Sequence, residues 1–139
     1  MKDSIFLDTN ILVYAYDLDA GVKHDIAMGI VERMWHEKTG IISVQVLQEF
    51  YITITRKILQ PLSHVVARGL IQSYLSWTIA LNDGKMILEA SEIENRYHLS
   101  FWDSLIIAAA YREKAEKILT EDLNHGQLIE GILIDNPFI

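Results

Sequence analysis

The sequence predicts an α/β fold, a three-layer sandwich in which helices cover both faces of a mostly parallel central sheet. Two observations lead to this prediction. Short apolar runs of strand length alternate along the chain with longer segments whose apolar residues recur at helical spacing. No linker, repeat or low-complexity segment interrupts the alternation, so we expect residues 1–139 to form a single domain.

The first third of the chain is predicted to hold two strands and two helices. Residues 5–7 form an apolar run that stops at Asp8, after which apolar periodicity resumes in a helix. Over 23–35 the apolar residues recur at every third or fourth position, which is typical of an amphipathic helix. Residues 41–42 are two isoleucines and predict a second short strand.

The middle of the chain is predicted to be mainly helical. Residues 44–59 carry a broad apolar stripe, and Ser43 can cap the helix that they form. Pro61 ends this segment because proline cannot continue a helix, and an apolar face resumes over 65–75. Residues 77–81 then predict a third strand.

The last third begins with a turn and two helices. Asn-Asp-Gly at 82–84 is a turn signal, and a helix is predicted over 85–97. A second helix opens at 100–103 and is apolar nearly all round over 105–111, so we expect it to be central. Two further strands are predicted at 117–120 and 132–134, separated by a polar loop.

Composition narrows the classes of function. The 139 residues include 12 Lys and Arg against 19 Asp and Glu, a net charge of −7, which argues against a protein that coats nucleic acid. A nuclease that gathers carboxylates around Mg²⁺ is compatible with this balance. The chain has no cysteine and no apolar stretch of membrane-span length, so we expect a cytoplasmic protein without a membrane partner. A hydrophobic content of 50% predicts an apolar surface covered by an oligomer or a tight partner.

Three acids are predicted to share one edge of the sheet. Asp8 follows the first strand and Asp122 follows the fourth, and parallel strands end along a single edge, where α/β proteins bind ligands. Asp103 lies in the first turn of the predicted central helix, which can point at the same edge. Each acid also has a plainer interpretation. Asp8 can cap a helix, Asp103 can form a capping box with Ser100, and Asp122 can be one of the polar residues that are common in loops.

Asp103 and Glu49 differ in what periodicity predicts. Asp103 shares a helical row with Ile106, Ile107 and Ala110, so its side chain is expected to be buried, where a carboxylate needs a partner or a metal. Glu49 falls away from the apolar stripe of its helix, so periodicity alone predicts a solvated surface residue.

Four segments together resemble the acidic motifs of PIN-domain ribonucleases and, within that family, VapC-type toxins of bacterial toxin–antitoxin pairs. They are Leu-Asp-Thr-Asn-Ile-Leu at 7–12, Gln-Glu-Phe-Tyr at 48–51, Trp-Asp-Ser-Leu-Ile at 102–106 and Leu-Thr-Glu-Asp-Leu-Asn-His-Gly at 119–126. The resemblance covers essentially the whole chain in motif order.

The resemblance implies a PIN-like fold and a metal-dependent endoribonuclease. Its acidic quartet would be Asp8, Glu49, Asp103 and Asp122, holding Mg²⁺, with Mn²⁺ as a substitute. Asp8 and Asp103 would contact the metal, while Glu49 and Asp122 would hold a second ion or orient a metal-activated water that attacks the phosphodiester. Thr120 and Asn10 match supporting polar positions of the family. Glu121 competes with Asp122 for the last place, and the Thr-x-Asp pattern favours Asp122.

The resemblance also implies partners, and two other functions stay open. The expected partners are an RNA substrate, with transfer RNA as the family-level expectation, a cognate antitoxin protein and a second copy of the chain in a homodimer. Arg56, Lys57 and Arg68 are candidate contacts to RNA phosphates, as are Arg112, Lys114 and Lys117. One alternative is a catalytically silent PIN-like binding module. The other is a haloacid-dehalogenase-type phosphatase, which usually needs an acid where this chain has Asn10.

Overall fold

The central sheet is six-stranded and its strand order is β3-β2-β1-β4-β6-β5 in the computed structural model, which describes residues 4–139. The strands are β1 (Ile5–Leu7), β2 (Gly40–Ser43), β3 (Thr78–Ala80), β4 (Lys117–Leu119), β5 (Leu128–Ile129) and β6 (Ile132–Asp135). All neighbouring pairs are parallel except β5 with β6. The predicted α/β class with a mostly parallel sheet is confirmed.

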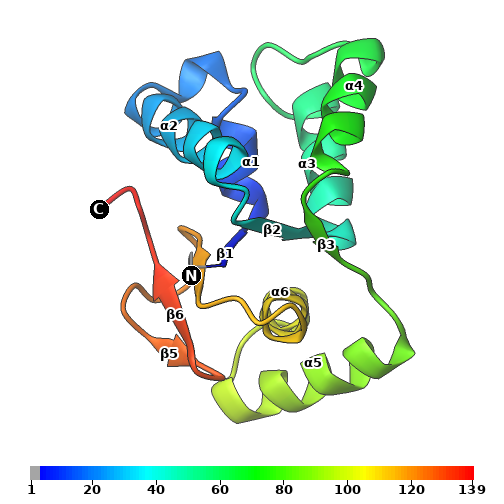
Figure 1. Ribbon diagram of the computed structural model, residues 1–139, viewed down its shortest axis with the longest axis vertical. Helices are drawn as coiled ribbons and strands as arrows, with labels where there is room; N and C mark the ends of the chain where they lie inside the picture. Colours follow the sequence, from blue (N-terminus) through cyan, green and yellow to red (C-terminus); the bar gives the residue numbers. More distant parts are fainter. Residues whose placement is uncertain (1–3) are drawn as a thin grey trace.

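Helices cover both faces of the sheet (Figure 1). The helices are α1 (Thr9–Tyr14), α2 (Val22–Glu37), α3 (Val44–Arg56), α4 (His64–Tyr74), α5 (Gly84–Tyr97) and α6 (Phe101–Arg112), with a short 3₁₀ turn at Leu18–Ala20. In Figure 1, α1 to α4 lie on one side of the sheet and α5 and α6 on the other, with α6 between the sheet and α5. No helix within residues 4–139 has the length and apolar character to cross a membrane.

The core is built from the apolar runs that the sequence predicts. Every residue of β1 and β2 is buried, as a strand covered on both faces requires. Seven consecutive residues of α6, Ser104–Ala110, are buried, so the prediction of a central helix is confirmed. A Cβ on Gly40 would lie 2.4 Å from Cζ3 of Trp77, so this strand position admits only glycine without rearrangement.

Two predicted elements differ in detail, and one strand was not predicted. The helix predicted over 44–59 ends at Arg56, and the chain then turns so that Leu62 N–H donates to the Ile54 carbonyl at 2.8 Å. The Asn-Asp-Gly signal at 82–84 does not form a separate turn, because Asp83 caps α5 through the Met86 N–H at 2.9 Å. Strand β5 was not predicted, since two residues of antiparallel strand have no recognisable periodicity.

The register of the two central strands fixes one corner of the sheet. In the β1–β4 pair, Leu7 lies opposite Leu119, and both strands end there. The Asp8 N–H donates to the Leu119 carbonyl at 3.0 Å, which continues the pairing by one step. Asp8 and Thr120 therefore leave the sheet side by side, at the carboxyl edge where a ligand site is expected.

Candidate active site

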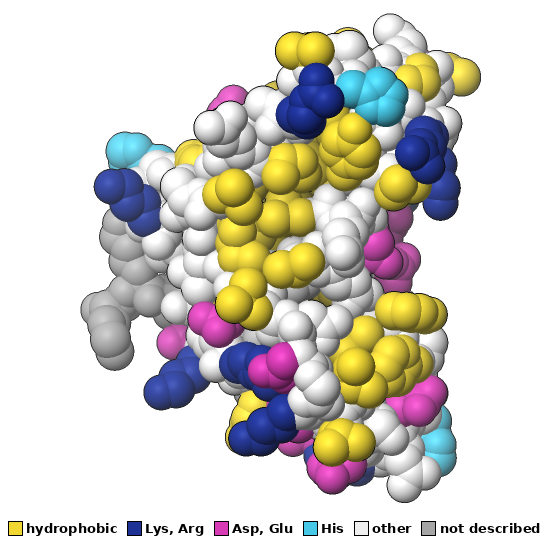
Figure 2. All heavy atoms as spheres, turned by 90° about the vertical axis from the view of Figure 1, so that its right-hand side faces the viewer, with side chains coloured by type: hydrophobic (Ala, Val, Ile, Leu, Met, Phe, Trp, Pro, Cys, Tyr) yellow, Lys and Arg dark blue, Asp and Glu magenta, His cyan; other side chains and the backbone are white. Residues whose placement is uncertain are grey.

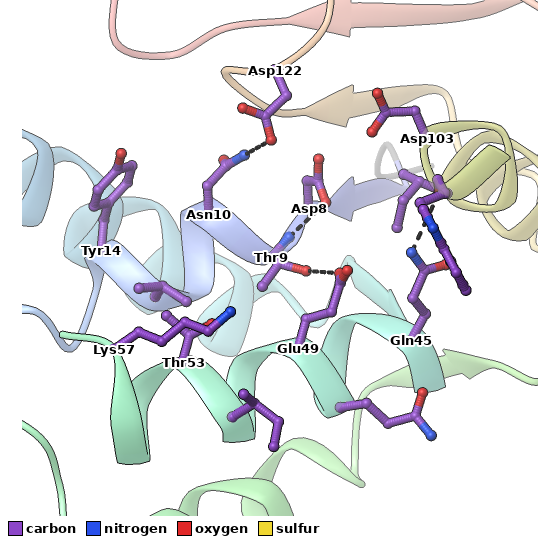
Figure 3. A pocket seen from close by; sticks show the side chains of 15 residues that line it. Asp8, Thr9, Asn10, Tyr14, Gln45, Glu49, Thr53, Lys57, Asp103 and Asp122 are labelled. Atoms are coloured by element: carbon purple, nitrogen blue, oxygen red, sulfur yellow. Dashed lines mark hydrogen bonds between the residues drawn. The ribbon is translucent and has the colours of Figure 1, made fainter. Parts of the chain in front are cut away.

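A pocket of about 530 Å³ opens at this edge of the sheet. Its walls come from the start of α1, one face of α3, the first turns of α6 and the loop after β4 (Figure 3). All four acids of the predicted quartet line it: Asp8, Glu49, Asp103 and Asp122. Residues separated by more than a hundred positions in the chain thus face a single space.

Asp8 is the buried member of the set, with 6% of its surface exposed. It is the N-cap of α1, and its carboxylate accepts hydrogen bonds from the Thr9 N–H at 2.7 Å and from Thr120 Oγ1 at 2.8 Å. Burial raises the pKa of Asp8 to about 6. The two hydrogen bonds oppose that rise, and the charges of Asp122 and Glu49 add to it. The capping role and the pocket position are therefore compatible in one side chain.

Thr120 connects Asp8 to Asp122. It is fully buried, and its hydroxyl donates to Asp8 while accepting the N–H of Asp122 at 3.1 Å. Asn10 Nδ2 donates to Asp122 Oδ2 at 3.0 Å, so the exposed Asp122 carboxylate is held from α1. Asn10 Oδ1 is buried without a hydrogen-bond partner, which leaves an unused acceptor beside the acids.

Glu49 is exposed, as periodicity predicts, but its exposed face is a wall of the pocket. Its carboxylate accepts a hydrogen bond from Thr9 Oγ1 at 2.7 Å, at the start of α1 (Figure 3). The helical wheel cannot distinguish open surface from the wall of a pocket, because the difference depends on how α1 packs against α3.

Asp103 is half-buried, so the expectation of a buried side chain is wrong for this residue, although the helix is buried from Ser104 onward. Asp103 lies in the first turn, where α6 reaches the pocket opening. Ser100 Oγ caps the Asp103 N–H at 3.1 Å. Burial raises the pKa of Asp103, the Ser100 hydroxyl lowers it, and the charges of Asp122 and Glu49 raise it further.

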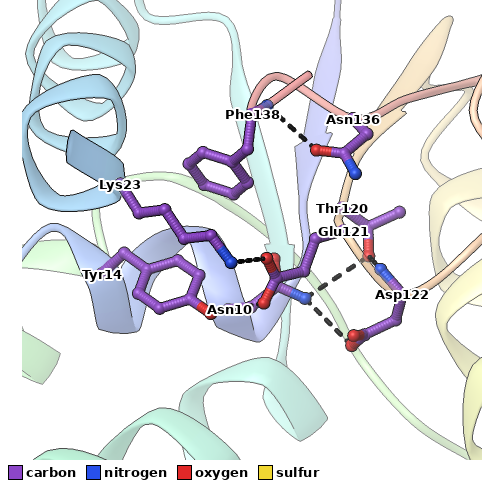
Figure 4. A network of polar contacts seen from close by, with 8 residues as sticks. All are labelled: Asn10, Tyr14, Lys23, Thr120, Glu121, Asp122, Asn136 and Phe138. Atoms are coloured by element: carbon purple, nitrogen blue, oxygen red, sulfur yellow. Dashed lines mark hydrogen bonds and ion pairs between the residues drawn. The ribbon is translucent and has the colours of Figure 1, made fainter. Parts of the chain in front are cut away.

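Glu121 and Asp122 point in different directions. Glu121 accepts hydrogen bonds from Lys23 Nζ at 2.8 Å and from the hydroxyl of Tyr14 (Figure 4). Burial disfavours the ionised form of Glu121, but the hydrogen bonds from Lys23 and Tyr14 outweigh it and lower the pKa. Glu121 does not line the pocket and Asp122 does, so the geometry favours Asp122 as the fourth acid.

The four carboxylates of the pocket are compatible with a divalent cation. None of the four acids forms an ion pair with a Lys or Arg of the part of the chain that the structure describes. Hard cations such as Mg²⁺ prefer carboxylate oxygens. Across residues 4–139, no three carboxylate or imidazole groups form a ready-made ligand set. This geometry still fits Mg²⁺, which commonly binds through one or two carboxylates and keeps its remaining waters.

Of the basic residues predicted to contact RNA phosphates, one lines the pocket. This residue is Lys57. Arg112 binds Asp83 at 3.0 Å, and Lys117 lies 3.5 Å from Asp135. These two cations are therefore paired with carboxylates that do not line the pocket.

Sequence reasoning singled out neither Gln45 nor Thr53 as pocket residues. With Glu49 and Lys57 they follow a spacing of four along α3 and past its end, and Figure 3 shows all four side chains on the pocket side of this helix. A polar row at this spacing, opposite the apolar stripe, is the signal that locates the wall.

Comparisons with known proteins agree with the fold. The family model described as PIN domain matches residues 5–128. Mycobacterium tuberculosis VapC20, described as a Sarcin-Ricin loop cleaving toxin, has 20% identity and a TM-score of 0.64 over 86% of this chain and 90% of its own. A toxin–antitoxin complex from Klebsiella pneumoniae has 19% identity and a TM-score of 0.69 over 96% and 98%. DNA-bound VapBC from Salmonella typhimurium has 19% identity and a TM-score of 0.66 over 98% and 99%. No curated protein matches the chain.

Proposed function

The chain belongs to the PIN-domain family, and from that premise we propose that it is a metal-dependent endoribonuclease, the toxin of a toxin–antitoxin pair. One observation carries the proposal. Four carboxylates from separate segments line one pocket, and no Lys or Arg in residues 4–139 forms an ion pair with any of them. Like charges collected without a counter-ion raise the free energy of the metal-free protein, and bound Mg²⁺ relieves that repulsion.

Each acid has a role in this proposal. Asp8 and Asp103 would contact the metal, while Glu49 and Asp122 would hold a second ion or orient water. When bound, Mg²⁺ or Mn²⁺ would supply Lewis-acid chemistry, polarising the scissile phosphate and lowering the pKa of water so that it can attack as hydroxide. Attack by water needs no 2′-hydroxyl and leaves a 5′-phosphate and a 3′-hydroxyl.

The supporting residues fix the carboxylates. The Thr120 hydroxyl holds one oxygen of Asp8 and the Thr9 N–H holds the other, so its carboxylate has a single orientation. Asn10 fixes Asp122 from across the pocket. Preorganised ligands lower the reorganisation that metal and substrate binding would otherwise require.

Partners follow from the relatives and from the surface. Two of the compared structures are described as a toxin–antitoxin complex and as VapBC, which supports a cognate antitoxin for this chain. Figure 2 shows hydrophobic side chains gathered over α3 and α4, where a groove of about 730 Å³ is lined mostly by apolar residues. An exposed apolar surface of this kind supports a protein partner. We also propose that the protein is a homodimer in the cytoplasm. Its proposed substrate is RNA, with transfer RNA as the first candidate.

The test is cleavage of total cellular RNA by the purified protein with Mg²⁺, with Mn²⁺ and with EDTA. We expect discrete metal-dependent fragments from the wild type and none from Asp103→Asn, which removes one charge while nearly preserving shape. Asp25→Asn, at an exposed position of α2 that does not line the pocket, is the matched control and should cleave like the wild type.

The fragment ends test the mechanism separately. A cyclic phosphate at the 3′ end would contradict attack by water. Intact RNA with every metal, from a folded protein that still binds Mg²⁺, would contradict the nuclease proposal and favour a binding module.

A further inference from the structure

Two side chains that line the pocket offer a largely exposed aromatic ring and a positive charge. They are Trp102, next to Asp103, and Lys57, just beyond the end of α3. We propose that Trp102 stacks on an unpaired base of the RNA and that Lys57 binds a phosphate of the same strand. This inference rests on the proposed function, because it assigns substrate contacts in the same site.

Trp102 is placed to present its ring to a ligand. Its side chain is 63% exposed although it lines the pocket, and it directly precedes Asp103 in the first turn of α6. Gln45 Nε2 donates to the Trp102 carbonyl at 3.3 Å, which fixes this turn against α3. The Phe101 ring lies 5.4 Å away in an edge-on contact that restrains the indole. An aromatic ring that is restrained yet exposed costs little entropy when a base stacks on it.

Lys57 is the one basic side chain lining this pocket within residues 4–139, and it forms no ion pair with their acids. It continues the row of Gln45, Glu49 and Thr53, whose first member touches the Trp102 turn. Twelve residues of helix span about 18 Å, so the row can follow a short segment of RNA. Figure 3 shows Glu49 between Gln45 and Lys57, so this carboxylate lies between the turn that carries Trp102 and the cation.

The charge balance of the chain explains why stacking is needed. With a net charge of −7, broad neutralisation of phosphates cannot supply the affinity for RNA. Stacking does not depend on charge, and it requires a base that is unpaired and turned out of a helix. The pair of contacts therefore selects flexible, unpaired nucleotides and places the adjoining phosphodiester beside the acids.

The experiment measures binding without cleavage. The probe is a short single-stranded oligoribonucleotide carrying a fluorescent adenine analogue, and the same oligonucleotide paired to its complement. Each is mixed with the protein and Ca²⁺, whose charge offsets that of the four acids, and electrophoresis verifies that the RNA stays intact. Trp102→Ala is compared with Trp102→Phe, which keeps an aromatic face. Tyr111→Ala is the matched control, since Tyr111 is 59% exposed at the other end of α6. Lys57→Ala is compared with Lys85→Ala, which removes an exposed lysine elsewhere.

We expect the wild type to quench the fluorescent base and to prefer the single strand. Trp102→Ala should weaken binding roughly tenfold or more and abolish quenching, while Trp102→Phe and Tyr111→Ala retain most of the affinity. Lys57→Ala should lower the slope of log affinity against log salt by about 0.7, the value for one phosphate contact to a single strand.

Equal affinity of the wild type and Trp102→Ala would overturn the inference while leaving the nuclease proposal intact. So would a Trp102→Ala variant that binds RNA normally but loses self-association, because Trp102 would then be a protein contact. Binding that depends on Trp102 in a protein that cleaves nothing with Mg²⁺ would overturn the nuclease activity and support the RNA contact.

Discussion

Replacing Asp8 by asparagine is expected to stabilise the metal-free protein. The pKa of Asp8 rises from 3.8 to about 6 on folding, so its ionised form costs about 3 kcal/mol at neutral pH, at about 1.4 kcal/mol per pKa unit. Asparagine removes the charge but weakens one hydrogen bond, with Thr120, a loss of about 1 kcal/mol. The net gain is about 2 kcal/mol, or a rise in Tm of roughly 5–10 °C.

The raised pKa of Asp8 also predicts how the difference in stability between the wild type and Asp8→Asn changes with pH. Because the folded pKa is raised, the folded state binds more protons than the unfolded state between about pH 4 and pH 6. Stability of the wild type should therefore fall relative to Asp8→Asn as the pH rises through this window, and the difference should be constant above about pH 7. Mg²⁺ should stabilise the wild type at neutral pH more than it stabilises Asp8→Asn.

Urea denaturation in EDTA at several pH values measures these differences. Asp25→Asn removes a charge at an exposed site and should stay within about 0.5 kcal/mol of the wild type. An Asp8→Asn protein no more stable than the wild type at neutral pH would refute the reasoning. A difference that does not change with pH would also refute it, because the charge of Asp8 would then not be its cause.

Substitutions at Gly40 and Thr120, each with a control, test the core and the site. Gly40→Ala places a methyl group against Trp77 and should lower the free energy of unfolding by about 1–3 kcal/mol. Gly29→Ala, with open space around its Cβ, should raise the free energy of unfolding by up to about 1 kcal/mol. Thermal denaturation measures both differences. Thr120→Val leaves a buried oxygen of Asp8 without its donor, so RNA cleavage should fall by roughly 10- to 100-fold, and Thr120→Ser should restore it. Normal cleavage by Thr120→Val would show that Asp8 needs no fixed orientation.

The strands and central helix were predictable because their signals are local. Residues 5–7 are a short apolar run, Ile118 and Leu119 are an apolar pair, and the unbroken apolar character around Ile107 identifies a helix that is buried from Ser104 to Ala110. Adjacent parallel strands then bring Asp8 and Thr120 to one edge without further information. Strand β5 was not predictable from the sequence, because its two residues form a strand only through their pairing with β6.

The pocket walls were less predictable because they depend on how helices pack together. Periodicity places Glu49 on the exposed side of α3, but only the packing of α1 against α3 brings that side to Asp8. Glu49 was predicted as a site residue only from the family resemblance, and its contact with Thr9 is known only from the structure. Trp102 adjoins a predicted acid, yet exposure of its ring cannot be read from an apolar segment.

The strand order also determines when the pocket can exist during synthesis. β4 lies between β1 and β6, so one edge of β1 has no partner until residues 117–119 have left the ribosome. Asp122 follows later still, in the loop where Glu121 pairs with Lys23 of α2. A nascent or truncated chain therefore has three acids and an open sheet edge but no complete quartet. In a protein proposed to cleave the RNA of its own cell, this order would delay activity until Asp122, the last of the four acids, has been synthesised.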